Sequence, residues 1–165
     1  MKRLAALLLA AALSGCGLHP MYAGGTTGHV ATTLARVEVA PIQGKSGWLV
    51  GNAVRDRLSA MGGGTPLYRL DITLDDQIAG LGVNRNDVVT RERRTLRARF
   101  QLVDLAKGTV LLDATAGSDA GIDVVGSEYA TIAAENTALE NLSDTVADQI
   151  VARLALYAHR TPSAP

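Results

Sequence analysis

The sequence predicts an α+β fold in which a four-stranded antiparallel or mixed sheet carries two helices packed on one face, in the chain order β-α-β-β-β-α. Two patterns support this prediction. Apolar and polar residues alternate in four segments, which is the period of a half-buried strand. In two other segments apolar residues recur at steps of three and four, which is typical of an amphipathic helix. The length of 165 residues suggests one domain with a single core.

The first predicted strand and helix occupy residues 35–61. Ala35, Val37 and Val39 alternate with charged residues, and Pro41 ends the strand. Ser46 is the predicted N-cap of the helix that follows, and the glycines at 62–64 are expected to end it. The apolar positions of this helix are Val50, Val54, Leu58 and Met61.

Three further strands are predicted between residues 68 and 116. Their apolar positions are Tyr68, Leu70, Ile72 and Leu74 in the second strand, Leu96, Ala98, Phe100 and Leu102 in the third, and Val110, Leu112, Ala114 and Ala116 in the fourth. A turn-prone stretch at 80–87 separates the second strand from the third, and Lys107-Gly108 is a hairpin turn signal. The Gly- and Asp-rich stretch at 117–126 is expected to be a loop.

A long helix is predicted from Ser127 to the end of the body. Its apolar residues fall at helical spacing, with no glycine or proline inside the run. They are Ile132, Leu139, Leu142, Val146, Ile150, Leu154 and Tyr157.

The N-terminus is typical of a lipoprotein signal peptide, residues 1–15. Lys2 and Arg3 give a positive start, and the apolar run at 4–13 is too short to span a membrane. Leu13-Ser14-Gly15-Cys16 then looks like a bacterial lipobox, in which the cysteine receives a diacylglycerol and a fatty acyl chain. The alternative is an unpaired, buried thiol at Cys16 that follows an ordinary signal peptide.

Cleavage before Cys16 would leave a lipidated tether at 16–33, an α+β body at 34–158 and a flexible tail at 159–165. More than one acyl chain makes a lasting membrane anchor. Gly17 stands where a signal for inner-membrane retention would place aspartate. We therefore expect the protein to be anchored at the outer membrane.

Composition argues against several classes of function. The 16 basic and 16 acidic residues balance, so no global positive field holds a nucleic acid. One cysteine and three scattered histidines make a metal centre improbable. Gly44-Lys45-Ser46 lies between a strand and a helix, but Val39 stands where a phosphate-binding loop needs its first glycine, which favours a helix cap. We expect no enzyme, no metal and no cofactor beyond the acyl groups on Cys16.

The most informative feature is a cluster of arginines within residues 85–99: Arg85, Arg91, Arg93, Arg94, Arg97 and Arg99. If the third strand extends back to Arg91, then Arg91, Arg93, Arg97 and Arg99 point the same way, because side chains on a strand alternate faces. Guanidinium groups bind phosphate and carboxylate in a bidentate manner, so this row suits a phosphorylated glycolipid. The alternative is cross-strand pairing with Asp71 and Asp75.

Several short motifs, in order, resemble the LPS-assembly lipoprotein family LptE. They are Gly15-Cys16-Gly17-Leu18-His19-Pro20-Met21-Tyr22, the Tyr68-Arg69-Leu70 strand opening, the arginine-rich strand running into Phe100-Gln101-Leu102-Val103-Asp104-Leu105, the Ser127-Glu128-Tyr129-Ala130 helix start, and Ala147-Asp148-Gln149-Ile150-Val151-Ala152-Arg153-Leu154 near the end. The resemblance implies a non-enzymatic outer-membrane lipoprotein on the periplasmic side. Its body would plug the lumen of the LptD β-barrel and help deliver lipopolysaccharide to the outer leaflet, with Arg91, Arg93, Arg97 and Arg99 as candidate contacts.

Two other classes of function stay open from the residues alone. One is an accessory lipoprotein of an ABC-type lipid transport system, which would contact a permease or a substrate-binding protein. The other is a lipid-anchored hydrolase, which the lack of a nucleophile and base pair in the sequence disfavours.

Overall fold

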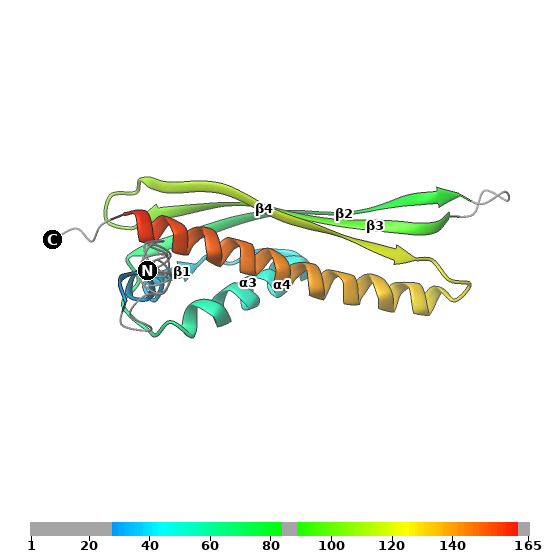
Figure 1. The fold of residues 1–165 in the computed structure, drawn as a ribbon, viewed down its shortest axis with the longest axis horizontal. Coiled ribbons are helices and arrows are strands. Elements are labelled where there is room, and N and C mark those ends of the chain that lie inside the picture. Colours follow the sequence, from blue (N-terminus) through cyan, green and yellow to red (C-terminus); the bar gives the residue numbers. More distant parts are fainter. Residues whose placement is uncertain (1–27, 84–88, 162–165) are drawn as a thin grey trace, which may run out of the picture.

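Four strands form one sheet in the order β1-β2-β3-β4, and the helices lie on one side of it (Figure 1). This computed structural model describes residues 28–83 and 89–161. In chain order the elements are α2 (His29–Leu34), β1 (Val37–Val39), α3 (Gly44–Ser59), β2 (Tyr68–Val83), β3 (Val89–Asp104), β4 (Val110–Asp123) and α4 (Glu128–Arg160). The predicted fold class is confirmed, with α2 as an additional short helix.

The sheet is mixed. β1 pairs in parallel with the start of β2, from Val37 opposite Tyr68 to Val39 opposite Leu70. β2 with β3 and β3 with β4 are antiparallel along nearly their whole lengths. The turn after β3 places Gly108 at a φ of +67°, which confirms the predicted hairpin at Lys107-Gly108.

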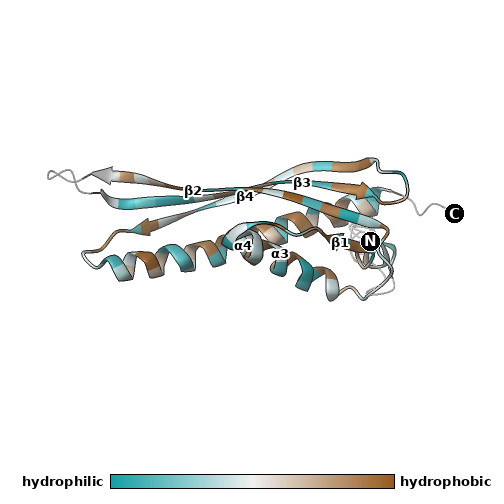
Figure 2. Ribbon diagram, turned by 180° about the vertical axis from the view of Figure 1, so that it is seen from behind, coloured by the Kyte–Doolittle hydropathy of each residue, from teal (hydrophilic) through white to brown (hydrophobic). Residues whose placement is uncertain are grey.

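The core lies between the sheet and the helices. Alternate residues of β2, β3 and β4 face the helices, and the hydropathy of these strands alternates along the ribbon (Figure 2). The largest fully buried side chains are Phe100, Leu34, Leu70, Leu96, Leu102, Leu139, Ile150, Leu154, Val50, Val54 and Val146. Most of the predicted apolar face of each helix is therefore the packed face.

Helix α4 begins at the residue that the sequence predicts. The Ser127 hydroxyl accepts a hydrogen bond from the Ala130 N–H at 3.4 Å, as an N-cap does. His159 and Arg160 lie in the last turn, where positive charge favours the helix dipole. Ile132 is 48% exposed, although its spacing predicts a core position.

The outer edge of β4 is closed at its middle by α4. The side-chain amide of Gln149 donates to the Gly117 carbonyl at 3.2 Å, and the Gly117 N–H donates to Gln149 Oε1 at 3.0 Å. Both backbone groups of Gly117 are thereby satisfied by one side chain.

Two predicted details of the strands and the first long helix are wrong. Residues 117–123 continue β4 and are not a loop, because their register with β3 runs on without a break to Asp123. Ser46 is not the N-cap of α3, since the helix begins at Gly44 and its N-cap is Gln43. Gly44 has a φ of +81°, a conformation that glycine adopts without steric cost, and this allows the earlier start.

The predicted turn at 80–87 is partly replaced by strand. β2 runs through Val83, with register shifts at Gly82, and β3 begins at Val89. Residues 84–88, which include Arg85, lie outside the described part of the chain.

The predicted signal peptide, Cys16 and most of the predicted tether also lie outside the described residues, and those predictions stay predictions. α2 begins inside the segment assigned to the tether and packs against α4. Among residues 28–83 and 89–161, no helix is both long and apolar enough to cross a bilayer.

Candidate functional site: the open face of the sheet

β3 presents a row of arginines on the side of the sheet that the helices leave uncovered. The strand begins at Val89, so Arg91, Arg93, Arg97 and Arg99 share one face, as the alternation requires. Residues two apart on a strand are about 7 Å apart, which sets the spacing within the pairs 91/93 and 97/99. On β4 they stand opposite Asp123, Gly121, Gly117 and Thr115.

We call the outward residues of β2, β3 and β4 the open face. They are Arg69, Asp71, Thr73, Asp75 and Gln77 on β2, Arg91, Arg93, Thr95, Arg97, Arg99 and Gln101 on β3, and Asp113, Thr115, Gly117, Asp119, Gly121 and Asp123 on β4. The five arginines and five aspartates of this set balance in charge. Four of the five arginines lie on β3, and all five aspartates lie on the two strands beside it, β2 and β4.

Three of the four predicted arginines pair with aspartates of β4. Arg99 holds Asp113 in a bidentate manner, with Nη2 2.6 Å from Oδ2 and Nε 3.0 Å from Oδ1. Arg97 Nη2 lies 3.1 Å from Asp119 Oδ1. Arg91 Nε lies 3.4 Å from Asp123 Oδ1.

The cross-strand pairing considered as an alternative does occur, but its acids come from β4. Asp71 and Asp75, the acids expected from β2, instead accept hydrogen bonds within their own strand. Arg69 holds Asp71 through two bonds of 2.8 Å, and Gln77 donates to Asp75 at 3.0 Å.

These contacts shift the pKa values of two carboxyls on β4. The hydrogen bond from Arg99, followed by that from Gln101, lowers the pKa of Asp113 to about 2. The hydrogen bond from Thr95 lowers the pKa of Asp119, and the charges of Arg97 and Arg93 act in the same direction. Both carboxylates are therefore ionised at neutral pH.

Arg93 differs from its three neighbours in the row. It is exposed, and it has no ion pair with any residue in the described ranges. Its register neighbours are Ala79 on β2 and Gly121 on β4, which carry no charge. When an anion binds this face, Arg93 therefore has no ion pair with a described residue to give up, whereas Arg91, Arg97 and Arg99 each have one.

Gly117 makes room for Arg97. A Cβ at this position would lie 2.5 Å from Arg97 Cδ and 2.9 Å from its Nη1. Because glycine has no side chain here, Arg97 can lie across β4 and reach Asp119.

Arg94, the remaining described arginine of the cluster, points to the other face of β3. Its Nη2 lies 2.7 Å from Asp76 Oδ2, and its Nη1 donates to the Glu135 carbonyl of α4 at 3.0 Å. Arg94 thus links β3 to β2 through Asp76 and to α4 through Glu135, and its role is to stabilise the fold.

Sequence reasoning missed Asp113, Asp119 and Asp123 as neighbours of the arginines. Because residues 117–126 were expected to form a loop, Asp119 and Asp123 were not assigned to the sheet. A usable signal is present, since polar residues or glycine occupy every odd position from 113 to 123.

The open face can bind an anion by exchange. Exposed ion pairs contribute only about 0–1 kcal/mol each, so a phosphate can displace an aspartate from an arginine at small cost. Bidentate geometry toward phosphate is available to every guanidinium of the row. In the part of the chain that the structure describes, no three His, Cys, Asp or Glu side chains gather as a metal site would need.

The fold is shared with bacterial lipoproteins of solved structure. A putative lipoprotein from Caulobacter crescentus matches with a TM-score of 0.67 at 22% identity, over 80% of this chain and 97% of that one. Rare lipoprotein B from Shewanella oneidensis matches with a TM-score of 0.60 at 12% identity, over 73% and 92% of the two chains. A minor lipoprotein from Acinetobacter baumannii matches with a TM-score of 0.58 at 17% identity, over 78% and 93%.

These structural comparisons define the fold class, an α+β domain with helices on one side of a four-stranded sheet. The model of the family LptE, described as lipopolysaccharide-assembly, matches residues 34–154, and the chain belongs to this family. The resemblance noted in the sequence is confirmed. No curated protein matches the chain.

Proposed function

We propose that this chain is an outer-membrane lipoprotein that plugs the LptD β-barrel and assists lipopolysaccharide transport and assembly, binding lipopolysaccharide through Arg91, Arg93, Arg97 and Arg99. The observation that carries the proposal is the row of arginines on a sheet face that none of the helices α2, α3 and α4 covers. Membership of the lipopolysaccharide-assembly family supplies the class of ligand.

The charge pattern suggests how binding proceeds. An anionic headgroup first meets Arg93, which has no described ion-pair partner to release. Phosphates then compete with Asp119 and Asp123 for Arg97 and Arg91, because those pairs are exposed and single. Arg99 exchanges last, since it holds Asp113 through two short bonds.

The shape suits a plug. α4 has 33 residues, which at 1.5 Å per residue is about 50 Å, comparable with the ~40–45 Å of a bilayer with its headgroups. A body of this length reaches through the lumen of a large barrel while acyl chains on Cys16 hold it at the periplasmic surface.

The binding proposal is tested by replacing all four arginines with alanine in the mature chain with Cys16→Ser. We expect lipopolysaccharide binding to fall at least tenfold while the circular dichroism spectrum and the unfolding midpoint stay close to those of the parent. A matched control removes four exposed arginines elsewhere, Arg36, Arg55, Arg153 and Arg160, and should bind nearly as the parent does. Equal loss in both variants would show that net charge, and not this face, determines binding.

The partner is tested by purifying the lipidated protein from membranes with whatever it binds. Recovery of a β-barrel protein in stable proportion supports the plug. Recovery of a permease or a substrate-binding protein would favour the accessory lipoprotein of an ABC-type transporter and overturn the proposal.

A further inference from the structure

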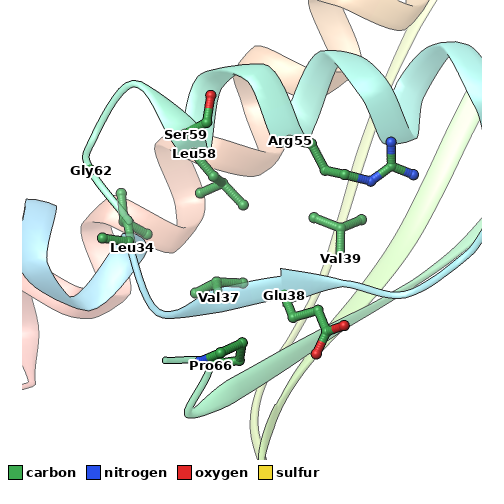
Figure 3. A pocket seen from close by; sticks show the side chains of 10 residues that line it. Leu34, Val37, Glu38, Val39, Arg55, Leu58, Ser59, Gly62 and Pro66 are labelled. Atoms are coloured by element: carbon green, nitrogen blue, oxygen red, sulfur yellow. The ribbon is translucent and has the colours of Figure 1, made fainter. Parts of the chain in front are cut away.

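A groove lies between α3 and β1 (Figure 3), away from the end of the sheet where β2 ends and β3 begins (Figure 1). It has a volume of about 480 Å³. Leu58 points into it from α3, and Leu34 lies at one end of it, where α2 ends. Its lining is mainly apolar, with the charges of Arg55 and Glu38 at the rim.

The groove runs along the free edge of β1. Val37, Glu38 and Val39 all line it, although the side chains of consecutive residues point to opposite faces of a strand. A hollow that touches all three must therefore lie along the edge. β1 is also the first strand in the sheet order, so no strand in residues 28–83 and 89–161 lies beside its other edge.

The backbone of β1 has hydrogen-bonding capacity on that side. The Arg36 carbonyl accepts from Leu67 at 2.9 Å, and the Ala40 N–H donates to the Leu70 carbonyl at 3.0 Å, so the even-numbered residues face β2. The peptide groups of Val37 and Val39 then point away from β2, toward the groove, where no described residue bonds to them. An edge of this kind accepts an extended segment as an added strand.

We propose that residues 18–22 of this chain, Leu18-His19-Pro20-Met21-Tyr22, bind in the groove as an added strand beside β1. The described chain begins at Gly28, one residue before α2, and α2 is six residues or about 9 Å long. The five residues 23–27 can span about 17 Å, which exceeds the length of α2 back to Leu34. The segment can therefore return to the groove.

The chemistry of the segment fits the groove. Four of its five residues, Leu18, Pro20, Met21 and Tyr22, are largely apolar, as is the lining of the groove. The link that follows is Ala-Gly-Gly-Thr-Thr, whose small residues offer little apolar area to compete for the groove. Because the segment is covalently attached, its effective concentration at the groove is of the order of millimolar, so even a weak contact is populated.

The consequence concerns orientation. Cys16 is two residues before Leu18, so a bound segment holds acyl chains on Cys16 within about 7 Å of the groove. The α3 and β1 end of the domain then lies at the membrane surface, and the long strands point away from it. This inference does not depend on lipopolysaccharide binding by the open face.

Amide hydrogen exchange tests the proposal in the mature chain, residues 16–165, with Cys16→Ser. The test variant adds Met21→Ser and Tyr22→Ser, and the matched control adds Thr26→Ser and Thr27→Ser in the link. We expect the Val37 and Val39 amides to exchange at least tenfold faster in the test variant than in the parent and the control. The Leu102 amide reports the sheet core and should be unchanged in all three.

Equal exchange of Val37 and Val39 in the parent and the test variant would overturn the proposal. Protection that falls on dilution would also overturn it, because it would identify a second copy as the occupant. A nitroxide at position 21 gives an independent measurement. It should broaden the Val37 and Leu58 amide signals and leave Tyr129 at the far end unaffected, and broadening of neither groove residue would contradict the proposal.

Discussion

The two faces of β3 carry the same residue type in two different settings. On the face toward the helices, Arg94 and Asp76 form a pair whose side chains are only 12% and 20% exposed. On the open face, Arg99 and Asp113 are 65% and 36% exposed. Water screens the outer pairs strongly and the inner pair much less. One strand therefore separates an arginine that holds the fold from arginines that are available to exchange partners.

The largest difference in stability should come from truncating one side chain on each face of β3 to alanine. Phe100→Ala removes a side chain with 0% exposure and leaves a cavity against α4, which should lower the free energy of unfolding by about 3–5 kcal/mol. Arg99→Ala, its neighbour on the open face, should change the free energy of unfolding far less, because water screens an ion pair as exposed as Arg99 and Asp113. Chemical denaturation of both variants measures the difference, and similar losses would contradict the two-sided description of β3.

A sharper comparison uses arginine on both faces. Arg94→Ala leaves the Asp76 carboxylate and the Glu135 carbonyl without their charged donor, and should cost about 1.5–3 kcal/mol. Arg97→Ala removes a single exposed contact and should cost about 0–1 kcal/mol. Unfolding midpoints in urea give both values. If Arg97→Ala proves the more costly of the two, the outer pairs are structural and the exchange mechanism fails.

Gly117→Val tests the space that Arg97 occupies. The new Cβ would meet Arg97 Cδ at 2.5 Å, so the guanidinium must leave Asp119, and we expect a cost of about 1 kcal/mol. Gly126→Val is the control, because nothing lies within 4 Å of a Cβ there. Thermal unfolding compares them, and a crystal structure of Gly117→Val with Arg97 still on Asp119 would show that the glycine is not needed.

The smallest effect concerns acid. The pKa of Asp113 is about 2 in the folded chain, below the ordinary value near 3.9, so its pairing stabilises the fold above pH 4. That contribution is lost as the pH falls from about 4 to 2. An NMR titration of the Asp113 carboxyl should find a midpoint near 2 in the parent, a clear rise in Arg99→Ala and a smaller rise in Gln101→Ala. A midpoint that stays near 2 without Arg99 would contradict the assigned cause.

The sequence predicted the elements whose residues differ strongly in polarity. Tyr68 to Leu74 and Leu96 to Leu102 alternate strictly between polar, mostly charged side chains and apolar ones, and both segments are strands with the expected faces. The end of β4 was missed because its inward residues Ser118 and Ala120 are small and its outward residues include glycine. There the long pairing with β3 decides the conformation, and local composition does not.

The candidate site could be predicted only in part, for the same reason. The shared direction of Arg91, Arg93, Arg97 and Arg99 follows from the period of a strand, and the structure has it. Which acids pair with these arginines depends on the order of the strands and on their register. Neither can be read from the alternation within a single segment. Helix α2 gave no signal because six residues are too few to show a helical period.

The two hydrogen bonds between Gln149 and Gly117 affect the tendency of the protein to self-associate at high concentration. An exposed outer strand can recruit the same strand of another molecule and start aggregation. At Gly117 the side-chain amide of Gln149 makes the two hydrogen bonds that the backbone of a second strand would make: it donates to the carbonyl and accepts from the N–H. The β4 strand of a second molecule could pair here only after both of those hydrogen bonds were broken. Helix α4 therefore opposes self-association through the edge of β4.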